Sequence, residues 1–520
     1  MNRKKKLMLN TISSLIFLFT NFICAFILQK FILKTYGSEV NGLVESITQF
    51  LGAVTLLDMG VGAVVQSSLY KPLAENDSKM ISRIFVSAGK FFRKIALILL
   101  IYVIALMCFY PFSVNKSFGI LYTVLLIGSM CVSSFAQYYF GVVNGLLLTA
   151  DQKGYIQYTS KSVTLFINTL ACVVLIQLGC SIHIVKLTTS LIFLLRPTYL
   201  QRYVKKHYSI DRKITYSEEP IKQKWNGMAQ HFASFVLTGT DSIVLTLFSS
   251  LSNVSVYSVY NMVCIGMKNI VISFTNGMQS LIGEMLAKKE MDKLKKFFDY
   301  IEWLIHTVTA LVFGCTGILL LNFIRVYTKG ITDINYIHPL FAVLITAANA
   351  GHCFRLPYNI IILAAGHYKQ TQSNYIIAMI MNIFISVVTV NFFGLVGVAA
   401  GTLAAMTYQT VWMARYNSKH ILHIDFKSFL KHIAIDMISV VISVIITFKI
   451  PMLSVSYLSF FILAFEVLIC WIAVSLIINY IFYKESMLEQ LRSGIFCSAI
   501  LRRSSLLMVA TLSLWGTPEA

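Results

Sequence analysis

Apolar stretches of about 18 to 25 residues recur along the chain, and that length lets an α-helix cross the hydrocarbon core of a bilayer. Barrel strands would instead alternate over about ten residues. Because lipid cannot satisfy backbone hydrogen bonds, spanning segments have to be helices or closed barrel strands. The pattern predicts an all-α polytopic membrane protein with about fourteen transmembrane helices. We place these helices at residues 8–32, 41–66, 86–110, 118–148, 156–178, 183–203, 229–249, 254–283, 300–324, 336–364, 370–391, 395–415, 430–450 and 457–482.

Short polar segments separate the apolar stretches, and the longest basic one divides the chain into two halves. Residues 1–203 are predicted to form an N-terminal six-helix bundle, and residues 204–228 a cytoplasmic basic loop. A C-terminal six-helix bundle follows in 229–415, and two additional transmembrane helices in 416–482. The remaining residues, 483–520, are interpreted as a cytoplasmic tail.

The two six-span halves resemble each other at corresponding positions. Leu73-Ala74 in the first half matches Leu286-Ala287 in the second, and Asn168 similarly matches Asn382. Since each half has an even number of spans, both begin on the same side of the membrane. The halves are therefore predicted to be a parallel repeat, related by an axis along the membrane normal.

The composition supports the membrane assignment, and the distribution of Lys and Arg changes how the net positive charge is interpreted. Only 12% of the residues are charged, whereas soluble domains carry about 25%. The formal net charge of +21 could suggest nucleic acid as a partner. Most Lys and Arg side chains, however, fall in alternate loops and in the tails, which is the positive-inside rule. We therefore expect cytoplasmic N- and C-termini and no nucleic-acid partner.

Polar residues inside the predicted spans are the candidates for function, because a charged side chain at mid-bilayer costs about 2.5–3.5 kcal/mol. The seventh span carries a polar face at helical spacing, formed by His231, Ser234, Thr238 and Asp241. The eighth span carries another along nearly its whole length, formed by Tyr257, Asn261, Cys264, Lys268, Thr275 and Gln279. Uncharged members could simply join helices through hydrogen bonds. For Lys268 a water-filled cavity is the better interpretation, since an ammonium group is not left unpaired in apolar surroundings.

The tenth span adds His352, Arg355 and Asn359 on one arc, with Asn349 at its edge. Pro357 follows directly and is expected to kink or break the helix there.

The second span carries two carboxylates, Glu45 and Asp58. On an ideal helix they point in different directions, so they serve one site only if the nearby glycines allow a bend. Glu45 could also be hydrated at the outer end of its span, and Asp58 could be a structural cap or pair.

Motifs of soluble enzymes are missing from the sequence. There is no glycine-rich phosphate loop, no H-E-x-x-H and no G-x-S-x-G motif. We expect no catalytic residues, no metal and no cofactor, and therefore no enzyme. A polar interior with acidic and basic members, divided between two halves, favours a substrate path with alternating access.

Two stretches resemble a known family. The first, from Tyr36, is YGSEVNGLVESITQFLGAVTLLDMGVGAVVQSSLYKPLAENDSKMISRI, and the second, from Thr238, is TGTDSIVLTLFSSLSNVSVYSVYNM. Both are similar to bacterial polysaccharide repeat-unit flippases (the Wzx type). These belong to the polysaccharide transporter branch of the multidrug/oligosaccharidyl-lipid/polysaccharide exporter superfamily. The family usually has Gly between the two elements of the second stretch, where this chain has Ser249-Ser250-Leu251-Ser252. The resemblance covers residues 1–480.

The resemblance implies two six-helix bundles around a central cavity plus two extra helices, in the bacterial plasma (inner) membrane. It implies that the protein moves an undecaprenyl-diphosphate-linked oligosaccharide between leaflets, for capsule, O-antigen or exopolysaccharide synthesis. Membrane lipids, a polysaccharide polymerase and a chain-length regulator are the other implied partners. The candidate substrate-binding residues are Lys268, Arg355, His352, Asn261, Tyr257 and Asn359, and the candidate ion-coupling residues are Asp58, Asp241 and Glu45.

Two alternatives remain open at this stage. An ion-coupled multidrug or metabolite exporter of the same fold would have a cavity dominated by carboxylates and aromatic rings, whereas the deepest charges here include Lys268 and Arg355. A membrane polysaccharide polymerase or ligase would need a long outward loop, and the longest one predicted is 325–336.

Overall fold

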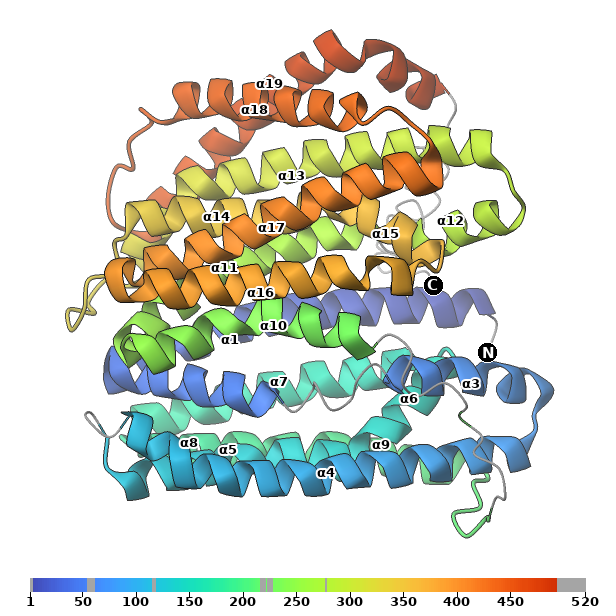
Figure 1. Ribbon diagram of the computed structural model, residues 1–520. Coiled ribbons are helices and arrows are strands. Elements are labelled where there is room, and N and C mark those ends of the chain that lie inside the picture. The colour runs from blue at the N-terminus through green and yellow to red at the C-terminus, as the bar shows by residue number, and fades with distance from the viewer. Residues whose placement is uncertain are drawn as a thin grey trace, which may run out of the picture. The chain divides into compact units, whose positions relative to one another are not determined.

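The computed structural model describes residues 3–53, 61–114, 118–215, 221, 228–275 and 278–492. Helices joined by short loops make up this part of the chain (Figure 1). The helices, with two π-helical turns η1 and η2, are α1 (Arg3–Gly52), α3 (Val61–Glu75), α4 (Ser78–Val114), α5 (Ile120–Ala136), η1 (Gln137–Gly141), α6 (Val142–Ala150), α7 (Gly154–Gln177), α8 (Ile182–Phe193), α9 (Leu195–His207), α10 (Met228–Phe248), α11 (Leu251–Thr275), α12 (Met278–Ala287), α13 (Met291–Tyr327), α14 (Pro339–Phe354), α15 (Leu356–Ala364), α16 (Tyr368–Phe393), α17 (Leu395–Asn417), η2 (Ser418–Leu422), α18 (Lys427–Thr447) and α19 (Tyr457–Arg492).

The predicted spans coincide with these helices or with helix pairs. Eight helical segments of the described residues are long and apolar enough to cross a membrane. α11 is also long enough, but its polar face lowers its hydropathy, and α8 and α9 are short because the helix is interrupted at Leu194. The prediction of an all-α polytopic membrane protein is confirmed.

The first two predicted spans are joined at Gly37. Its φ is +83°, a conformation that side chains with a Cβ rarely adopt, and it separates two helical segments within α1. The second segment ends at Gly52, and residues 54–60, which include Asp58, lie outside the described part of the chain.

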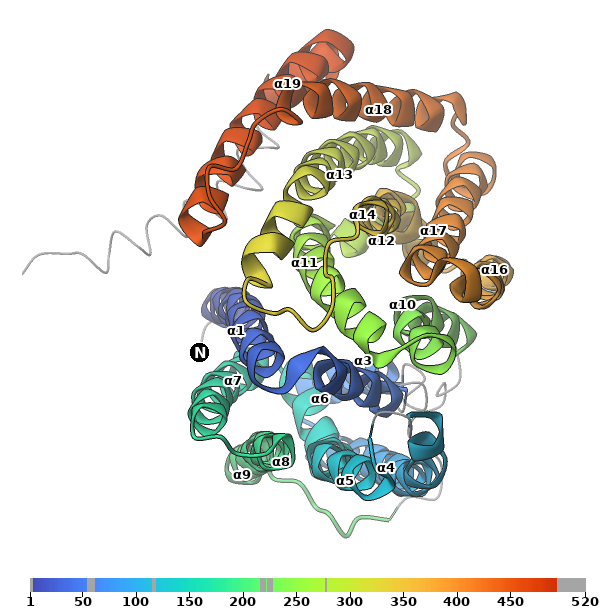
Figure 2. The ribbon, with the colours of Figure 1, turned by 90° about the vertical axis from the view of Figure 1, so that its left-hand side faces the viewer.

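The described residues form two compact units. Unit 1 contains residues up to 266, 323–351 and 366–412, and unit 2 contains 267–322, 352–365 and the described residues from 413 onward. In unit 1, α1 packs along α7, α5 packs against α4 and α8, and α10 packs against α16 (Figure 2). A large apolar core in this unit includes Ile47, Phe92 and Leu147, which are each fully buried.

Unit 2 has a smaller apolar core where α19 crosses α13. Trp471 is 1% exposed and packs with Cys315, Leu463 and Val467. Gly314 makes this approach possible, because a Cβ there would lie 1.9 Å from the indole ring. α18 packs against α19 in the same unit.

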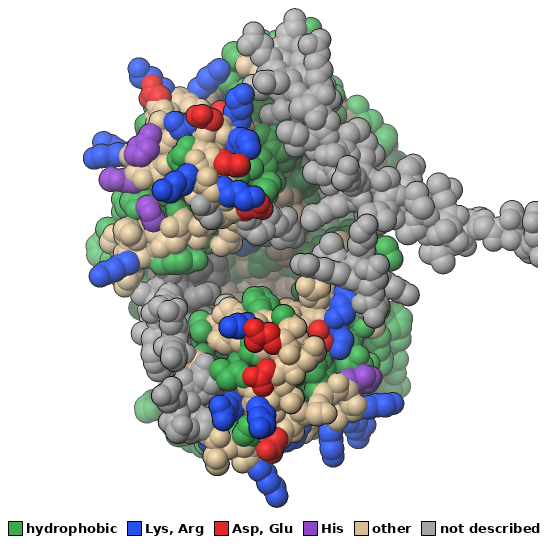
Figure 3. Space-filling model, turned by 90° about the vertical axis from the view of Figure 1, so that its right-hand side faces the viewer, with side chains coloured by type: hydrophobic (Ala, Val, Ile, Leu, Met, Phe, Trp, Pro, Cys, Tyr) green, Lys and Arg blue, Asp and Glu red, His purple; other side chains and the backbone are tan. Residues whose placement is uncertain are grey.

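Apolar side chains cover the outer faces of many helices. Phe109 on α4 is 74% exposed and Phe465 on α19 is 65% exposed. Such exposure of large apolar groups suits contact with lipid rather than with water. Charged side chains instead gather on a face at the helix ends, with apolar side chains around its margin (Figure 3).

Candidate functional site

A buried carboxylate in unit 1 is held by hydroxyl groups from two other helices. Asp241 on α10 is 5% exposed. The hydroxyl of Tyr257 on α11 donates to Oδ2 at 3.0 Å, and the hydroxyl of Thr402 on α17 lies 2.9 Å from both carboxylate oxygens. Thr402 in turn accepts a hydrogen bond of 2.9 Å from Nδ2 of Asn382 on α16. Four helices therefore meet around one acidic group.

The same cluster has one buried oxygen that accepts no hydrogen bond from the described residues, Oδ1 of Asn382. Carboxylate, hydroxyl and amide oxygens are the ligands of hard cations, and a carboxylate can also take up a proton. Asn261 is half-buried on α11, one turn after Tyr257.

Unit 2 contains a group of basic side chains that belong to the predicted spans. Arg355 lies between α14 and α15, and the helix break expected at Pro357 is found there. Arg355 is 5% exposed, and its guanidinium donates to Nδ1 of His352 at 3.2 Å. Lys268 on α11 is half-buried and, like Arg355, acts electrostatically on His352. Asn359 follows one turn later on α15, and its backbone N–H donates to the carbonyl of Arg355.

Other residues selected from the sequence are placed differently or lie outside the described residues. Glu45 on α1 is half-buried and interacts electrostatically with Lys186 on α8 in unit 1. Sequence reasoning did not select Lys186. Asp58 lies outside the described residues, as do the side chains of His231, Ser234 and Thr238.

Sequence reasoning also missed polar residues whose partners are far away in the chain. Thr402 and Asn382 were not proposed as neighbours of Asp241, although polar residues inside spans 11 and 12 were a usable signal. In unit 2 the structure brings together a second buried group, which sequence reasoning did not select: Glu302, His306, Tyr358, His432 and Asp436.

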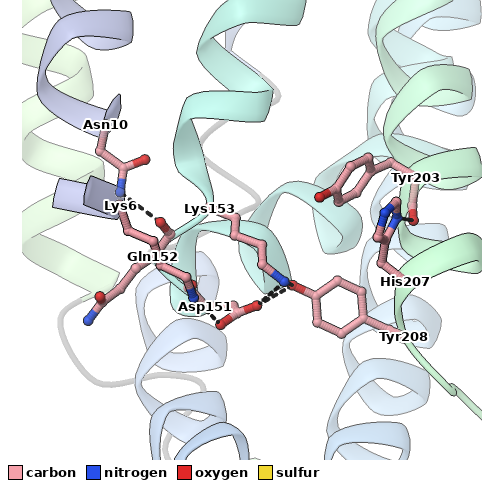
Figure 4. Close-up of polar contacts among 8 residues, drawn as sticks. All are labelled: Lys6, Asn10, Asp151, Gln152, Lys153, Tyr203, His207 and Tyr208. Atoms are coloured by element: carbon pink, nitrogen blue, oxygen red, sulfur yellow. Dashed lines mark hydrogen bonds and ion pairs between the residues drawn. The ribbon is translucent and has the colours of Figure 1, made fainter. Parts of the chain in front are cut away.

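A third polar cluster ties helix ends together outside the spans of unit 1 (Figure 4). Asp151, between α6 and α7, accepts from Lys6 at 3.2 Å, Lys153 at 2.7 Å and the Tyr208 hydroxyl at 2.5 Å. Burial alone would raise the pKa of Asp151, but the hydrogen bonds and positive charge of these neighbours outweigh it and hold the pKa below its usual range. Burial and the adjacent carboxylate raise the pKa of Tyr208. The cluster therefore keeps an ionised Asp151 as the link between α1, α7 and the segment after α9.

These features define a class of protein, a polytopic all-α membrane protein with buried acidic and basic groups within its spans. No protein-family model and no curated protein matches the chain. Solved structures do match. The chain is similar to the lipid II flippase MurJ in an inward closed conformation, at a TM-score of 0.64 and 14% identity, covering 93% of this chain and 99% of that one.

The chain is also similar to a multidrug resistance MATE family transporter of the MOP superfamily, in its inward-facing conformation. The TM-score is 0.60 at 14% identity, with 75% of this chain and 93% of that one covered. A MOP superfamily transporter from Pyrococcus furiosus matches at a TM-score of 0.51 and 14% identity, covering 80% and 96%. The protein thus has the fold of MOP-superfamily transporters.

Proposed function

We propose that the protein is a flippase that translocates undecaprenyl-diphosphate-linked oligosaccharide units across the bacterial plasma membrane by alternating access. The fold supports a transporter, since flippases and exporters share it. The sequence resemblance supports the polysaccharide branch. The observation that carries the choice of cargo is the basic group of unit 2, in which Arg355, Lys268 and His352 lie within the membrane segments.

A diphosphate is the chemical partner that such a group fits. Its negative charges interact strongly with cations where water is scarce, and a guanidinium can bind phosphate oxygens in pairs. His352 accepts a hydrogen bond from Arg355, which orients the guanidinium. Asn359, Tyr257 and Asn261 are proposed to contact the sugar or the diphosphate through hydrogen bonds, since amides and phenols suit polar cargo.

The experiment is complementation of a strain that lacks the gene. Lys268→Ala and Arg355→Ala should reduce surface polysaccharide to the level of that strain, and the lipid-linked precursor should accumulate in the inner leaflet. Lys293→Ala is the matched control, because Lys293 is an exposed cation of unit 2 that pairs with Glu290, and its polysaccharide should stay normal. Normal polysaccharide in both the Lys268→Ala and Arg355→Ala variants, at normal protein amounts, would reject the proposal.

Ion coupling is proposed at Asp241, with Glu45 and Asp58 as further candidates. Asp241 is supported by its burial and by the surrounding hydroxyl and amide oxygens, which suit a sodium ion or a proton. Asp241→Asn should keep the hydrogen bond from Tyr257 while removing the charge, so transport should be lost with the protein amount retained.

An exporter of cationic drugs or metabolites is the second candidate function. A buried carboxylate beside an aromatic ring, as Asp241 and Tyr257 provide, is a site that organic cations can use. The same strain decides between the two functions. Sensitivity to cationic dyes without a defect in polysaccharide would favour the exporter.

We further propose that both termini are cytoplasmic, as the distribution of Lys and Arg in the sequence supports. A polysaccharide polymerase and a chain-length regulator are proposed as partners that use the translocated units. Reporter fusions at the two ends of the chain test the orientation.

A further inference from the structure

A chain of four buried side chains crosses unit 2 and has no part in the proposed cargo site. Glu302 and His306 lie one turn apart on α13, Tyr358 lies on α15, and Asp436 lies on α18. Glu302 and His306 are each 1% exposed, Tyr358 is 2% exposed and Asp436 is 9% exposed. Ionisable groups are rarely placed in a membrane segment without a role.

Three contacts join these side chains in a line. Nδ1 of His306 lies 2.7 Å from Oδ2 of Asp436, and Nε2 of the same ring lies 3.2 Å from the hydroxyl of Tyr358. That hydroxyl lies 2.5 Å from Oε1 of Glu302. Each distance is within hydrogen-bond range, so each contact requires a hydrogen atom between its two heavy atoms.

The ordinary protonation states supply one hydrogen too few. A neutral imidazole has one N–H, a phenol has one O–H, and two ionised carboxylates have none. If the imidazole hydrogen points to Asp436, the single hydrogen of Tyr358 can serve His306 or Glu302 but not both. If it points to Tyr358, the contact between His306 and Asp436 has no hydrogen. The three contacts are complete only when one more proton is present in the chain.

Other charged and titratable groups face this chain from α13, α18 and α19. His432 on α18 places Nε2 at 3.6 Å from Oε2 of Glu302, an oxygen that accepts no hydrogen bond from the described residues. Nδ1 of His432 lies 2.6 Å from the hydroxyl of Tyr483 on α19, a contact that the phenol hydrogen completes. Asp299 on α13 acts electrostatically on Glu302, and Lys431 on α18 acts on His432.

We propose that the Asp436–His306–Tyr358–Glu302 chain is a proton-binding site that holds one exchangeable proton and with it fastens α18 to α13 and α15. When the proton leaves, two lone pairs face each other in one of the three contacts, and the attachment of α18 weakens. The site lies outside the three ion-coupling candidates of the sequence. The proton-binding site also gives a chemical role to α18, which is the first of the two helices that follow the predicted repeat. The inference holds whatever the cargo is, because it rests on the hydrogen count alone.

The test is the apparent unfolding midpoint of the purified protein in lipid nanodiscs, followed from about pH 5 to about pH 9. Below about pH 6.5 the histidine of the unfolded chain holds the same proton, so stability should not change there. Above that pH only the folded state holds it, and the folding equilibrium falls by a factor of about ten per pH unit until the folded state also releases the proton. Wild type should show this fall. Asp436→Asn and Glu302→Gln each supply the missing hydrogen from an amide, so both should show a flatter dependence than wild type.

Glu284→Gln is the matched control, because Glu284 is an exposed carboxylate of unit 2 that pairs with Lys288 one turn further along. Its curve should run parallel to that of wild type. If Asp436→Asn does not fold, Glu302→Gln decides, because it keeps the size of the buried side chain and the packing of Tyr358 between Phe298 and Phe429. Curves of Glu302→Gln and wild type that run parallel would overturn the proton-binding site. Since no transport is measured, this result is independent of the cargo.

Discussion

The approach of α1 to the start of α11 in unit 1 gives a sharp prediction about stability. A Cβ built on Gly42 would lie 1.7 Å from the carbonyl oxygen of Leu251 and 2.6 Å from its carbonyl carbon. The neighbouring group is backbone, so no side-chain rotation can relieve the overlap. Gly42→Ala therefore requires α1 to move away from α11. Overpacking of this kind costs about 1–3 kcal/mol.

The displacement would also weaken hydrogen bonds on both sides of Gly42. Asn41 donates to the Ser255 hydroxyl at 2.9 Å, and Ser46 lies 2.7 Å from the Thr246 hydroxyl. A shift large enough to remove the overlap lengthens these contacts beyond hydrogen-bond range, and each net hydrogen bond is worth about 0.5–1.5 kcal/mol. The total loss should therefore exceed that of a typical surface substitution.

The assay is the apparent unfolding midpoint of the purified protein, compared with that of Gly89→Ala. Gly89 lies inside α4, and apart from its chain neighbours and the backbone of its own helix, no atom of the described residues lies within 4 Å of the place that a Cβ would take there. Alanine at this position should therefore be neutral or stabilise by about 0.5–1 kcal/mol. The expected result is a clear fall of the midpoint for Gly42→Ala alone. Equal midpoints in the two variants would refute the close approach of α1 and α11.

Two further substitutions test other contacts. Gly314→Ala places a Cβ at 1.9 Å from the Trp471 ring. This substitution should destabilise the protein by about 1–3 kcal/mol and make the tryptophan fluorescence more accessible to a quencher. Unchanged quenching would contradict the close contact between Gly314 and Trp471. Asp151→Asn removes the charged partner of Lys6 and Lys153 and should cost about 1–3 kcal/mol at neutral pH. Because the folded-state pKa of Asp151 is lowered, its contribution is present above the unfolded pKa of about 3.9 and is lost as the pH falls. Midpoints measured from neutral to acid pH should therefore converge for Asp151→Asn and wild type, and a constant gap would count against the linkage.

The sequence was sufficient for the helical class and for local features of the spans. Apolar length and low charge predict the helices, and Pro357 predicts the break beside Arg355, because both depend on a few neighbouring residues. The approach of Tyr257 to Asp241 was partly visible, since each lies on a polar face of its own helix. Periodicity along one helix shows which side chains share a face, but it contains no information on which helix packs there.

The long-range parts of the sites could not be predicted for that reason. Thr402 reaches Asp241 from a helix that is 161 residues further along the chain. The contact between His306 and Asp436 spans 130 residues and involves a helix outside the predicted repeat. The interaction of Glu45 with Lys186 could not be predicted either, because a charged side chain near the end of a span is ordinarily assigned to solvent.

The residues that carry the family resemblance have structural roles in unit 1, and this limits what the resemblance says about cargo. Gly37 adopts a positive φ, Gly42 allows the close approach to Leu251, and Asn41 hydrogen-bonds α11. Each is explained by the fold, which exporters of different cargo share. Substitutions at Gly42 should therefore reduce the amount of folded protein, whereas Lys268→Ala should leave that amount unchanged and abolish translocation. Measuring protein amount and surface polysaccharide together in both variants separates the two effects. Loss of folded protein in Lys268→Ala would instead mean that this lysine holds the fold together and does not recognise cargo.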